Sequence, residues 1–323
     1  MNSLILTAGY GNRFKPYTDK LAKPAIEFLT LPMLMYSRYY AEVLQSNSIT
    51  FNLHHLAETV QSANKQFKNP NINFHYSDET KELLDSGGGI TNALKQFYPK
   101  DSCVFVSNGD NICLINEGEL LKAKQFHEQQ SCDVTIMVGK HPQAGLSLSA
   151  LYADHKGQLQ DKGLNRSKDL SPYHFLGMMF FNSKIIPQLP NEAFSLFDDG
   201  LLPQRDHLKI QLYVLSDYLW FETGNPEDYL KASFSCMKHM SDTNSNFGAL
   251  LKKIIKSYRP NVSFSNSDQS LVLSCSELKN SSTEGVVVVG DNCHIDNSHL
   301  KNCVIHSEAV IEGQSLDNTF VLF

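Results

Sequence analysis

The sequence predicts an α/β protein: a Rossmann-like mixed, mainly parallel sheet flanked by helices, followed by a short parallel β-helix. Two observations lead to this prediction. Short apolar runs alternate with amphipathic stretches through the first two-thirds of the 323 residues, the pattern of strands joined by crossover helices. Near the end of the chain, apolar residues recur with a period of sixteen, which is typical of stacked coils.

The first two-thirds of the chain hold the elements of the sheet in alternating order. Strands are predicted at 3–7, 49–53, 72–77, 103–107 and 132–139, and helices at 32–46, 56–67, 88–98 and 117–130. After residue 145, the stretch LSLSALYADHKGQLQ alternates apolar and polar side chains, which predicts antiparallel hairpins. Ligands of such open sheets bind beyond the carboxyl ends of the strands.

Three parts are expected along the chain. Residues 1–240 form the main domain. Residues 241–284 form a Ser/Asn-rich linker with a short helix and strand, and residues 285–323 form the β-helix. A shift of sixteen maps HLKNCVIH onto SLDNTFVL. The same shift relates Val289 to Ile305, Ile295 to Ile311 and Leu300 to Leu316. Only about two triangular coils can be built, so we expect this stub to pack on the main domain or on a second subunit.

Composition excludes several classes of protein. The net charge of −6 gives no basic face for nucleic acid. No apolar run approaches the ~18 to 20 residues of a membrane span, and the first residues enter a strand without the pattern of a secretion signal. The seven cysteines contain no C-x-x-C pair, which favours reduced thiols in a cytoplasmic protein over disulfides or a zinc site.

The stretch LTAGYGNRFKPYTDKLAKP, just behind the first strand, predicts a phosphate-binding loop. Gly9 and Gly11 can take positive φ and let a ligand approach the backbone. Two common phosphate motifs do not fit: no Gly-Lys-Ser/Thr follows at P-loop spacing, and Phe14 stands where a dinucleotide fingerprint needs its third glycine. Backbone N–H groups, the forked guanidinium of Arg13 and the ammonium of Lys23 suit a polyphosphate.

This opening motif, L-x-A-G-x-G-x-R-x-x-P-x-T-x-x-x-x-K-P, resembles that of the sugar-1-phosphate nucleotidyltransferases. The blocks LHHLAETV, LLDSGGGITNAL, VSNGD, FLG and WFETGNPEDYLKAS follow in family order, so that the resemblance covers about residues 1–235. Two of these blocks are similar to those of N-acetylmuramate-1-phosphate uridylyltransferases and bacterial mannose-1-phosphate guanylyltransferases. The resemblance implies the nucleotidyltransferase fold, a left-handed form for the β-helix, and a role of that β-helix in assembly or regulation.

The implied reaction joins a nucleoside triphosphate and a sugar 1-phosphate to give an NDP-sugar and pyrophosphate, for cell-surface polysaccharide. The sugar phosphate is largely dianionic at pH 7, so no general base is needed, and the difficulty is repulsion between two polyanions. Arg13 and the amides of Gly9 to Arg13 are expected to hold the β- and γ-phosphates. Lys23 is placed between the α-phosphate and the sugar phosphate. Asp110 and Glu222 are expected to bind Mg²⁺, although the family has Asp at the second position.

The full set of expected site residues is as follows. The catalytic residues are Arg13, Lys23 and Asp110. The nucleotide-binding residues are Ala8, Gly9, Gly11, Asn12, Arg13, Gly87, Gly88, Asn108 and Gly109. The residues that bind the sugar phosphate are Lys23, Lys162, Gly177 and Asn182. Lys162 matches the family's Glu-Lys-Pro block only through Asp161-Lys162-Gly163, and Glu222 could instead be a surface strand residue.

Other functions remain open at this level. A non-catalytic, nucleotide-sugar-binding regulatory protein of the same fold would tolerate the change at Glu222, but the intact Arg13, Lys23 and Asp110 argue against it. A nicotinamide-dependent oxidoreductase is disfavoured by the missing third glycine. The base is undetermined: uridine and guanosine lead, and cytidine is the third option. Homo-oligomers could form through the β-helix.

Overall fold

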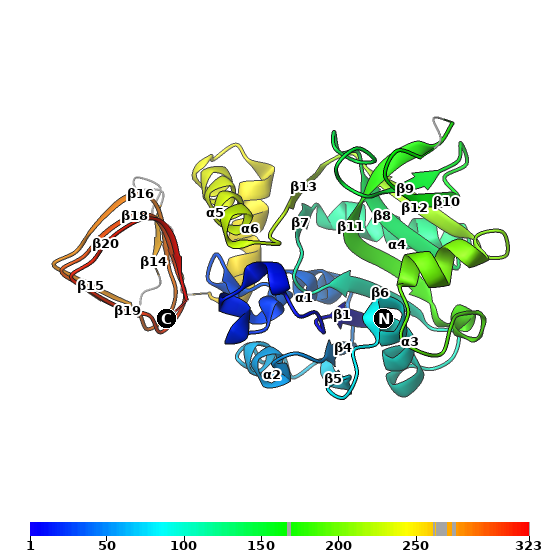
Figure 1. Cartoon of the computed structure of the whole chain (residues 1–323), viewed down its shortest axis with the longest axis horizontal. Coiled ribbons are helices and arrows are strands. Elements are labelled where there is room, and N and C mark those ends of the chain that lie inside the picture. The colour runs from blue at the N-terminus through cyan, green and yellow to red at the C-terminus, as the bar shows by residue number, and fades with distance from the viewer. Residues whose placement is uncertain (167–168, 261, 263–269, 273–275, 323) are drawn as a thin grey trace.

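A triangular β-helix stands at one end of the molecule and a larger α/β domain at the other (Figure 1). Helices α5 (Pro226–Ser241) and α6 (Asn246–Tyr258) lie between them. This computed structural model describes residues 1–166, 169–260, 262, 270–272 and 276–322. The predicted linker 241–284 therefore contains stretches outside the described residues, while its predicted helix is α6.

The main sheet is mixed and mostly parallel near the predicted phosphate loop. Among the described residues it has nine strands in the order β10-β9-β11-β6-β1-β4-β5, with β8 pairing with both β11 and β12. Their bounds are β1 (Asn2–Leu6), β4 (Ser48–Leu53), β5 (Asn73–Asp78), β6 (Cys103–Asn108), β8 (Val134–Gly139), β9 (Ala150–Ala153), β10 (Leu159–Gly163), β11 (Ser171–Asn182) and β12 (Ile210–Leu215). Strands β1, β4, β5 and β6 pair in parallel, whereas β11 runs antiparallel to β6, β8 and β9. The predicted fold class is confirmed.

In the described part of this domain there are also two small antiparallel pairs and four further α-helices. The pairs are β2 (Glu27–Phe28) with β3 (Leu31–Pro32), and β7 (Ile112–Ile115) with β13 (Tyr218–Phe221). The helices are α1 (Leu34–Val43), α2 (Ala57–Lys65), α3 (Asp85–Phe97) and α4 (Glu117–Gln129). Because side chains alternate along a strand, adjacent Leu4 and Ile5 enter different apolar cores, one on each face of the sheet.

Helix α4 buries a histidine that couples folding to pH. His127 is 3% exposed, and its Nδ1 lies 2.9 Å from the Thr135 hydroxyl. Burial lowers the pKa of His127 to about 4. The unfolded chain therefore takes up a proton below pH ~6.5 that the folded chain resists, so stability falls as the pH drops from there toward 4.

We predict that His127→Gln weakens this acid sensitivity. Between pH 7 and 4.5 the variant should lose about 2 kcal/mol less of its unfolding free energy than the unaltered chain, because glutamine takes up no proton. Urea unfolding at the two pH values measures this difference. The matched control is His207→Gln at an exposed histidine. An acid sensitivity equal to that of the unaltered chain would refute the prediction.

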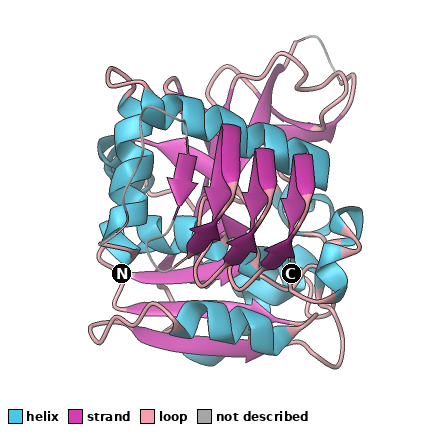
Figure 2. Ribbon diagram, turned by 90° about the vertical axis from the view of Figure 1, so that its left-hand side faces the viewer, coloured by secondary structure: helices cyan, strands magenta, loops and turns pink. Residues whose placement is uncertain are grey.

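The C-terminal part forms two parallel sheets of a β-helix. One has the order β14-β16-β18-β20 and the other β15-β17-β19 (Figures 1 and 2). The bounds are β14 (Ser270–Val272), β15 (Glu277–Lys279), β16 (Ser282–Val289), β17 (His294–Asp296), β18 (His299–Ile305), β19 (Val310–Glu312) and β20 (Ser315–Val321). The period of sixteen is confirmed, since Val289 pairs with Ile305, Ile295 with Ile311 and Leu300 with Leu316.

The predicted start of this β-helix, residue 285, was wrong. Strands β14 and β15 lie within the predicted linker, yet they pair in register with β16 and β17. Strand β16 also begins earlier, at Ser282. The β-helix therefore contains more than the two coils expected. The early coil was missed because its sequence is dominated by Ser and Asn and shows little of the apolar repeat.

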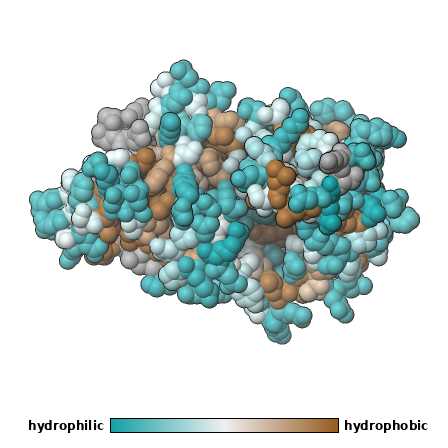
Figure 3. Space-filling view, turned by 45° about the horizontal axis from the view of Figure 1, so that its top comes forward, coloured by the Kyte–Doolittle hydropathy of each residue, from teal (hydrophilic) through white to brown (hydrophobic). Residues whose placement is uncertain are grey.

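The β-helix packs on the main domain, as its limited size predicts. Val288 and Phe320 belong to the same apolar core as Phe14 and Tyr229 of the main domain. Hydrophilic side chains cover most of the face in Figure 3, which is hollowed near the middle, with apolar residues at the floor of the hollow. None of the helices in the described ranges combines the length and the apolar character needed to cross a membrane.

Candidate active site

A pocket of about 250 Å³ lies beyond the carboxyl ends of β1, β4 and β6, where the parallel sheet predicts a ligand site. The residues that line it are Leu6, Thr7, Ala8, Gly9, Gly11, Lys23, Pro24, Asn52, Leu83, Asp85, Ser86, Asn108 and Asp110. It thus brings together the opening loop, the turn that carries Lys23 and the end of the strand before Asp110.

The opening loop, whose Gly9 and Gly11 line this pocket, has backbone N–H groups that are available to a ligand. Within the described ranges, no group accepts a hydrogen bond from the N–H groups of Gly9 to Arg13. Gly11 adopts a φ of 64°, and a Cβ there would lie 2.8 Å from the Thr18 methyl group, so this position requires glycine. Gly9 has no such constraint, because a Cβ there would meet nothing within 4 Å. A run of unpaired N–H groups favours an anion.

Lys23 and Asp110 form an ion pair in the pocket, next to the opening loop. Lys23 begins a short turn, Lys23–Ala25, and is 8% exposed, while its Nζ lies 2.8 Å from Asp110 Oδ2. Asp110 follows β6 through Gly109, where a Cβ would lie 2.6 Å from the Thr7 methyl group. The Asp110 side chain is 41% exposed and accessible to a ligand. The pair brings two charges that are 87 residues apart to one point.

Glu222 joins this cluster from the loop after β13. Its Oε1 lies 3.8 Å from Arg13 Nη2. Thr223, the next residue, donates a 3.2 Å hydrogen bond to the carbonyl oxygen of Asp110. A Cβ on Gly224 would lie 2.4 Å from Glu222 Oε1 and 2.6 Å from Arg13 Nη2, so a small residue lets these side chains approach. The structure therefore pairs Lys23 with Asp110 and Arg13 with Glu222, and the Thr223 hydrogen bond joins the loop of the second pair to Asp110. Arg13 and Glu222 are not among the residues that line the pocket.

The donor set is compatible with magnesium. In the described part of the chain, no group of three or more His, Cys, Asp or Glu side chains could hold a metal on its own. Magnesium commonly takes one or two carboxylates and completes its shell with water and substrate phosphates. The partly exposed carboxylates of Asp110 and Glu222, next to a loop suited to phosphate, fit that preference.

Asn52, a buried residue that sequence analysis missed, lines the pocket, and the buried Glu79 holds its side chain. Asn52 Oδ1 accepts a 2.7 Å hydrogen bond from the Thr7 N–H, and its Nδ2 donates to Glu79 Oε1 at 3.0 Å. Glu79 is 3% exposed, and burial raises the pKa of its carboxyl group. Asn52 lies near the end of the strand predicted at 49–53, and Glu79 lies two residues after the strand predicted at 72–77. These positions near the ends of strands were the signal that the sequence offered. Only the pairing of β4 with β5 brings them together.

Gly87 and Gly88 are not among the residues that line the pocket, and their contact with the nucleotide stays a prediction. The Gly87 N–H donates to the Phe194 carbonyl at 3.0 Å, and a Cβ on Gly87 would lie 2.2 Å from the Phe194 ring. A Cβ on Gly88 would lie 2.9 Å from the Glu192 carbonyl oxygen. These glycines let the segment around Phe194 pack on α3, and the neighbouring Ser86 lines the pocket instead.

Three other residues expected to bind the sugar phosphate have different surroundings in the structure. Gly177, with a φ of 75°, lies against Asn111, and a Cβ there would be 2.7 Å from Asn111 Nδ2. Lys162 pairs with Asp198 and lowers the pKa of that carboxyl group. Asn182 was misplaced: it pairs with Cys103 at the far end of β6 and accepts a hydrogen bond from the Lys184 N–H.

The chain is similar to known proteins over part of its length. Residues 2–146 match the model of the nucleotidyl transferase family. The chain is distantly homologous to mannose-1-phosphate guanyltransferases. The protein of that name from Gibberella zeae is 25% identical over 240 residues, which are 72% of this chain and 63% of the relative. Mannose-1-phosphate guanylyltransferase catalytic subunit beta of Xenopus tropicalis is 24% identical over 232 residues, 71% of this chain and 63% of that protein. The chain thus aligns with less than two-thirds of these relatives.

Solved structures support the fold. HddC from Yersinia pseudotuberculosis superimposes with a TM-score of 0.59 at 24% identity, covering 72% of this chain and 98% of HddC. A second HddC structure, complexed with GMP-PN, gives a TM-score of 0.57 at 23% identity, with coverage of 72% and 98%.

Proposed function

We propose that this protein is a magnesium-dependent sugar-1-phosphate nucleotidyltransferase. A phosphate oxygen of the sugar 1-phosphate attacks the α-phosphorus of a nucleoside triphosphate, the bond to the β-phosphate breaks, and pyrophosphate leaves. The observation that carries the proposal is the meeting of Lys23 and Asp110, 2.8 Å apart, next to a loop whose N–H groups from Gly9 to Arg13 have no acceptor in the described part of the chain. Cation, carboxylate and anion-binding backbone are the groups this transfer requires.

Each group has a distinct part in the proposal. The N–H groups of Gly9 to Arg13 and the Arg13 guanidinium bind the β- and γ-phosphates, and Arg13 exchanges its contact with Glu222 for the nucleotide. Lys23 balances charge between the α-phosphate and the incoming sugar phosphate. Asp110 and Glu222 would hold Mg²⁺, which would neutralise phosphate charge. The residues themselves supply orientation, which lowers the barrier without a general base.

Guanosine is the preferred base in this proposal. Its support comes from the names of similar proteins: mannose-1-phosphate guanyltransferases, and a similar structure complexed with GMP-PN. In this chain, Asn52 of β4 and Ser86 at the start of α3 line the pocket. Mannose 1-phosphate is the first sugar phosphate to test, and the product would serve cell-surface polysaccharide synthesis.

A substrate panel tests the proposal. The four nucleoside triphosphates are combined with several sugar 1-phosphates, and pyrophosphate release is measured with Mg²⁺ and with excess chelator. We expect release with at least one pair, highest with GTP and abolished by the chelator. If a nucleotide sugar raises the melting temperature but no pair turns over, the protein is a regulatory binding protein and the catalytic proposal fails.

A further inference from the structure

The β-helix reaches the back of the phosphate-binding loop. Phe320, in the last strand β20, is 4% exposed. Its ring centroid lies 6.0 Å from that of Phe14 and 4.8 Å from that of Tyr17, two residues that flank the turn after Arg13. The Tyr17 hydroxyl also donates a 3.0 Å hydrogen bond to the Phe320 carbonyl oxygen. One residue near the end of the chain therefore packs directly on the segment that positions Arg13.

A second contact reaches the segment that carries Lys23. Glu27, four positions after Lys23, is 7% exposed. Its carboxylate accepts hydrogen bonds from the Ser307 N–H at 3.1 Å and from the Ser307 hydroxyl at 2.7 Å. Ser307 follows β18 of the β-helix. The buried carboxylate is thus satisfied by the other domain, which a buried charge requires.

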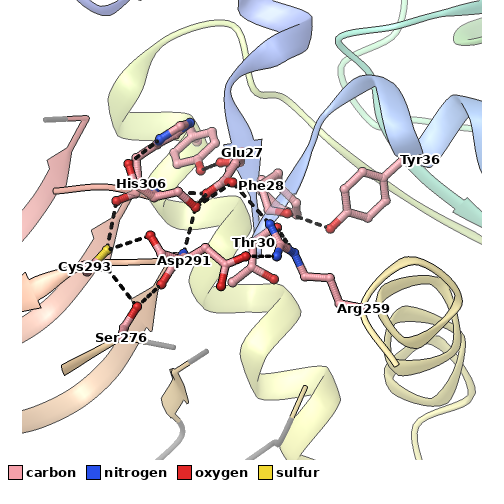
Figure 4. Close-up of polar contacts among 12 residues, drawn as sticks. Glu27, Phe28, Thr30, Tyr36, Arg259, Ser276, Asp291, Cys293 and His306 are labelled. Atoms are coloured by element: carbon pink, nitrogen blue, oxygen red, sulfur yellow. Dashed lines mark hydrogen bonds and ion pairs between the residues drawn. The ribbon is translucent and has the colours of Figure 1, made fainter. Parts of the chain in front are cut away.

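Arg259, the residue directly after α6, contacts both the β-helix and the segment after Lys23. Its guanidinium pairs with Asp291 of the β-helix and lies 3.5 Å from Glu27 Oε1 (Figure 4). Its Nε donates a 2.8 Å hydrogen bond to the carbonyl oxygen of Thr30. Thr30 has a φ of 74°, which a β-branched residue rarely adopts, so the tight turn after Glu27 depends on surrounding contacts to hold it.

Tyr229 joins the aromatic and the polar contacts. This fully buried residue of α5 lies 4.8 Å from Phe320 and 5.5 Å from Phe14, measured between ring centroids. Its hydroxyl donates a hydrogen bond to the carbonyl oxygen of Glu27. The two contacts from the β-helix are therefore parts of one packed unit behind Arg13 and Lys23.

We propose that the β-helix braces the phosphate-binding loop, with Phe320 and Ser307 as positioning residues that hold Arg13 and Lys23 for the nucleotide. This inference rests on the proposed function for its catalytic consequence, but the bracing itself concerns the loop alone. It assigns the β-helix a role within the active site of one chain, independent of any assembly that it forms.

Hydrogen exchange without substrate tests the bracing directly. Phe320→Ala should raise the exchange rate of amides in residues 9–26 by about fivefold or more, because the loop loses the ring packed behind it. Phe320→Leu should restore most of the protection. The control is Ile311→Ala, which empties a 2% exposed site inside the β-helix and lies in a different core cluster. Equal exchange of residues 9–26 in Phe320→Ala and the unaltered chain would overturn the proposal, as would equal loosening by Ile311→Ala.

Steady-state kinetics test the consequence for the reaction. Phe320→Ala should raise KM for the triphosphate about tenfold and change KM for the sugar 1-phosphate less than about twofold, since the brace acts on the triphosphate loop. If that variant does not fold, Ser307→Ala removes only a hydroxyl group and should raise KM for the triphosphate about threefold. Unchanged KM in the variants of an active enzyme would contradict the positioning role. If the unaltered chain shows no turnover, the proposed function fails, while the exchange experiment still decides the bracing.

Discussion

Replacing Asp110 by alanine is expected to lower kcat for nucleotidyl transfer by about 10³-fold or more, the scale seen when a principal charge-stabilising group is removed. The carboxylate would bind the magnesium ion beside the phosphates, and it also holds Lys23 at 2.8 Å. Its loss removes one metal ligand and releases the ammonium group. Pyrophosphate release at saturating Mg²⁺ and substrates measures the effect.

The fold should survive this change. Asp110 is 41% exposed, but its partner Lys23 is 9% exposed, so the variant leaves a nearly buried ammonium unpaired at a cost of about 1 to 3 kcal/mol. We therefore expect a lower melting temperature and a protein that is still folded at the assay temperature. Asp206→Ala, which removes an exposed carboxylate elsewhere, is the matched control and should retain full activity. Full activity in Asp110→Ala would refute the metal assignment.

Lys23→Ala is expected to cost about 10²- to 10³-fold in kcat/KM. Its ammonium is nearly buried, and a charge in that setting acts on a phosphate more strongly than a solvated one. Lys23→Arg should not restore activity, because the planar guanidinium needs more width than an ammonium in a site shaped around it. The measurement is initial rate against the concentration of each substrate in turn.

Two further variants distinguish a catalytic role of Lys23 from a general effect of positive charge. Lys15→Ala removes a cation that is 57% exposed from the same loop, where it pairs with Asp19, and should change kcat/KM less than about threefold. The double variant Lys23→Ala with Asp110→Ala should be no slower than the worse single variant, because the two groups act as a unit. An additive loss, or a Lys15→Ala effect as large as that of Lys23→Ala, would contradict this role for Lys23.

Much of the sheet could be predicted because its strands are short apolar runs between amphipathic helices. The strand predicted at 103–107 is observed at Cys103–Asn108, and the helix predicted at 117–130 at Glu117–Gln129. The repeat was found for the same reason, since Leu300 and Leu316 both face the inside of the β-helix. These features depend on local spacing, which a sequence shows directly.

The parts that could not be predicted depend on contacts distant in sequence. A contact with the nucleotide was predicted for Gly87. The sequence does not show that Phe194, which is distant in the chain, packs against this glycine. Asn182 was misplaced because the register of β11 on β6, which carries it to the far end of the sheet, is set by pairing. The contact of Phe320 with Tyr17 joins residues about 300 positions apart, and no local sequence pattern predicts it.

The central claim is that Arg13, Lys23, Asp110 and Glu222 surround a single metal-bound triphosphate. A crystal structure of the protein with Mn²⁺ and a non-hydrolysable GTP analogue tests it most directly, since the anomalous signal of Mn²⁺ locates the metal. We predict a metal peak within coordination distance of Asp110 and Glu222, with the β- and γ-phosphates on the N–H groups of Gly9 to Arg13. A metal or triphosphate bound in another cleft, away from Lys23 and Asp110, would contradict the proposed enzyme.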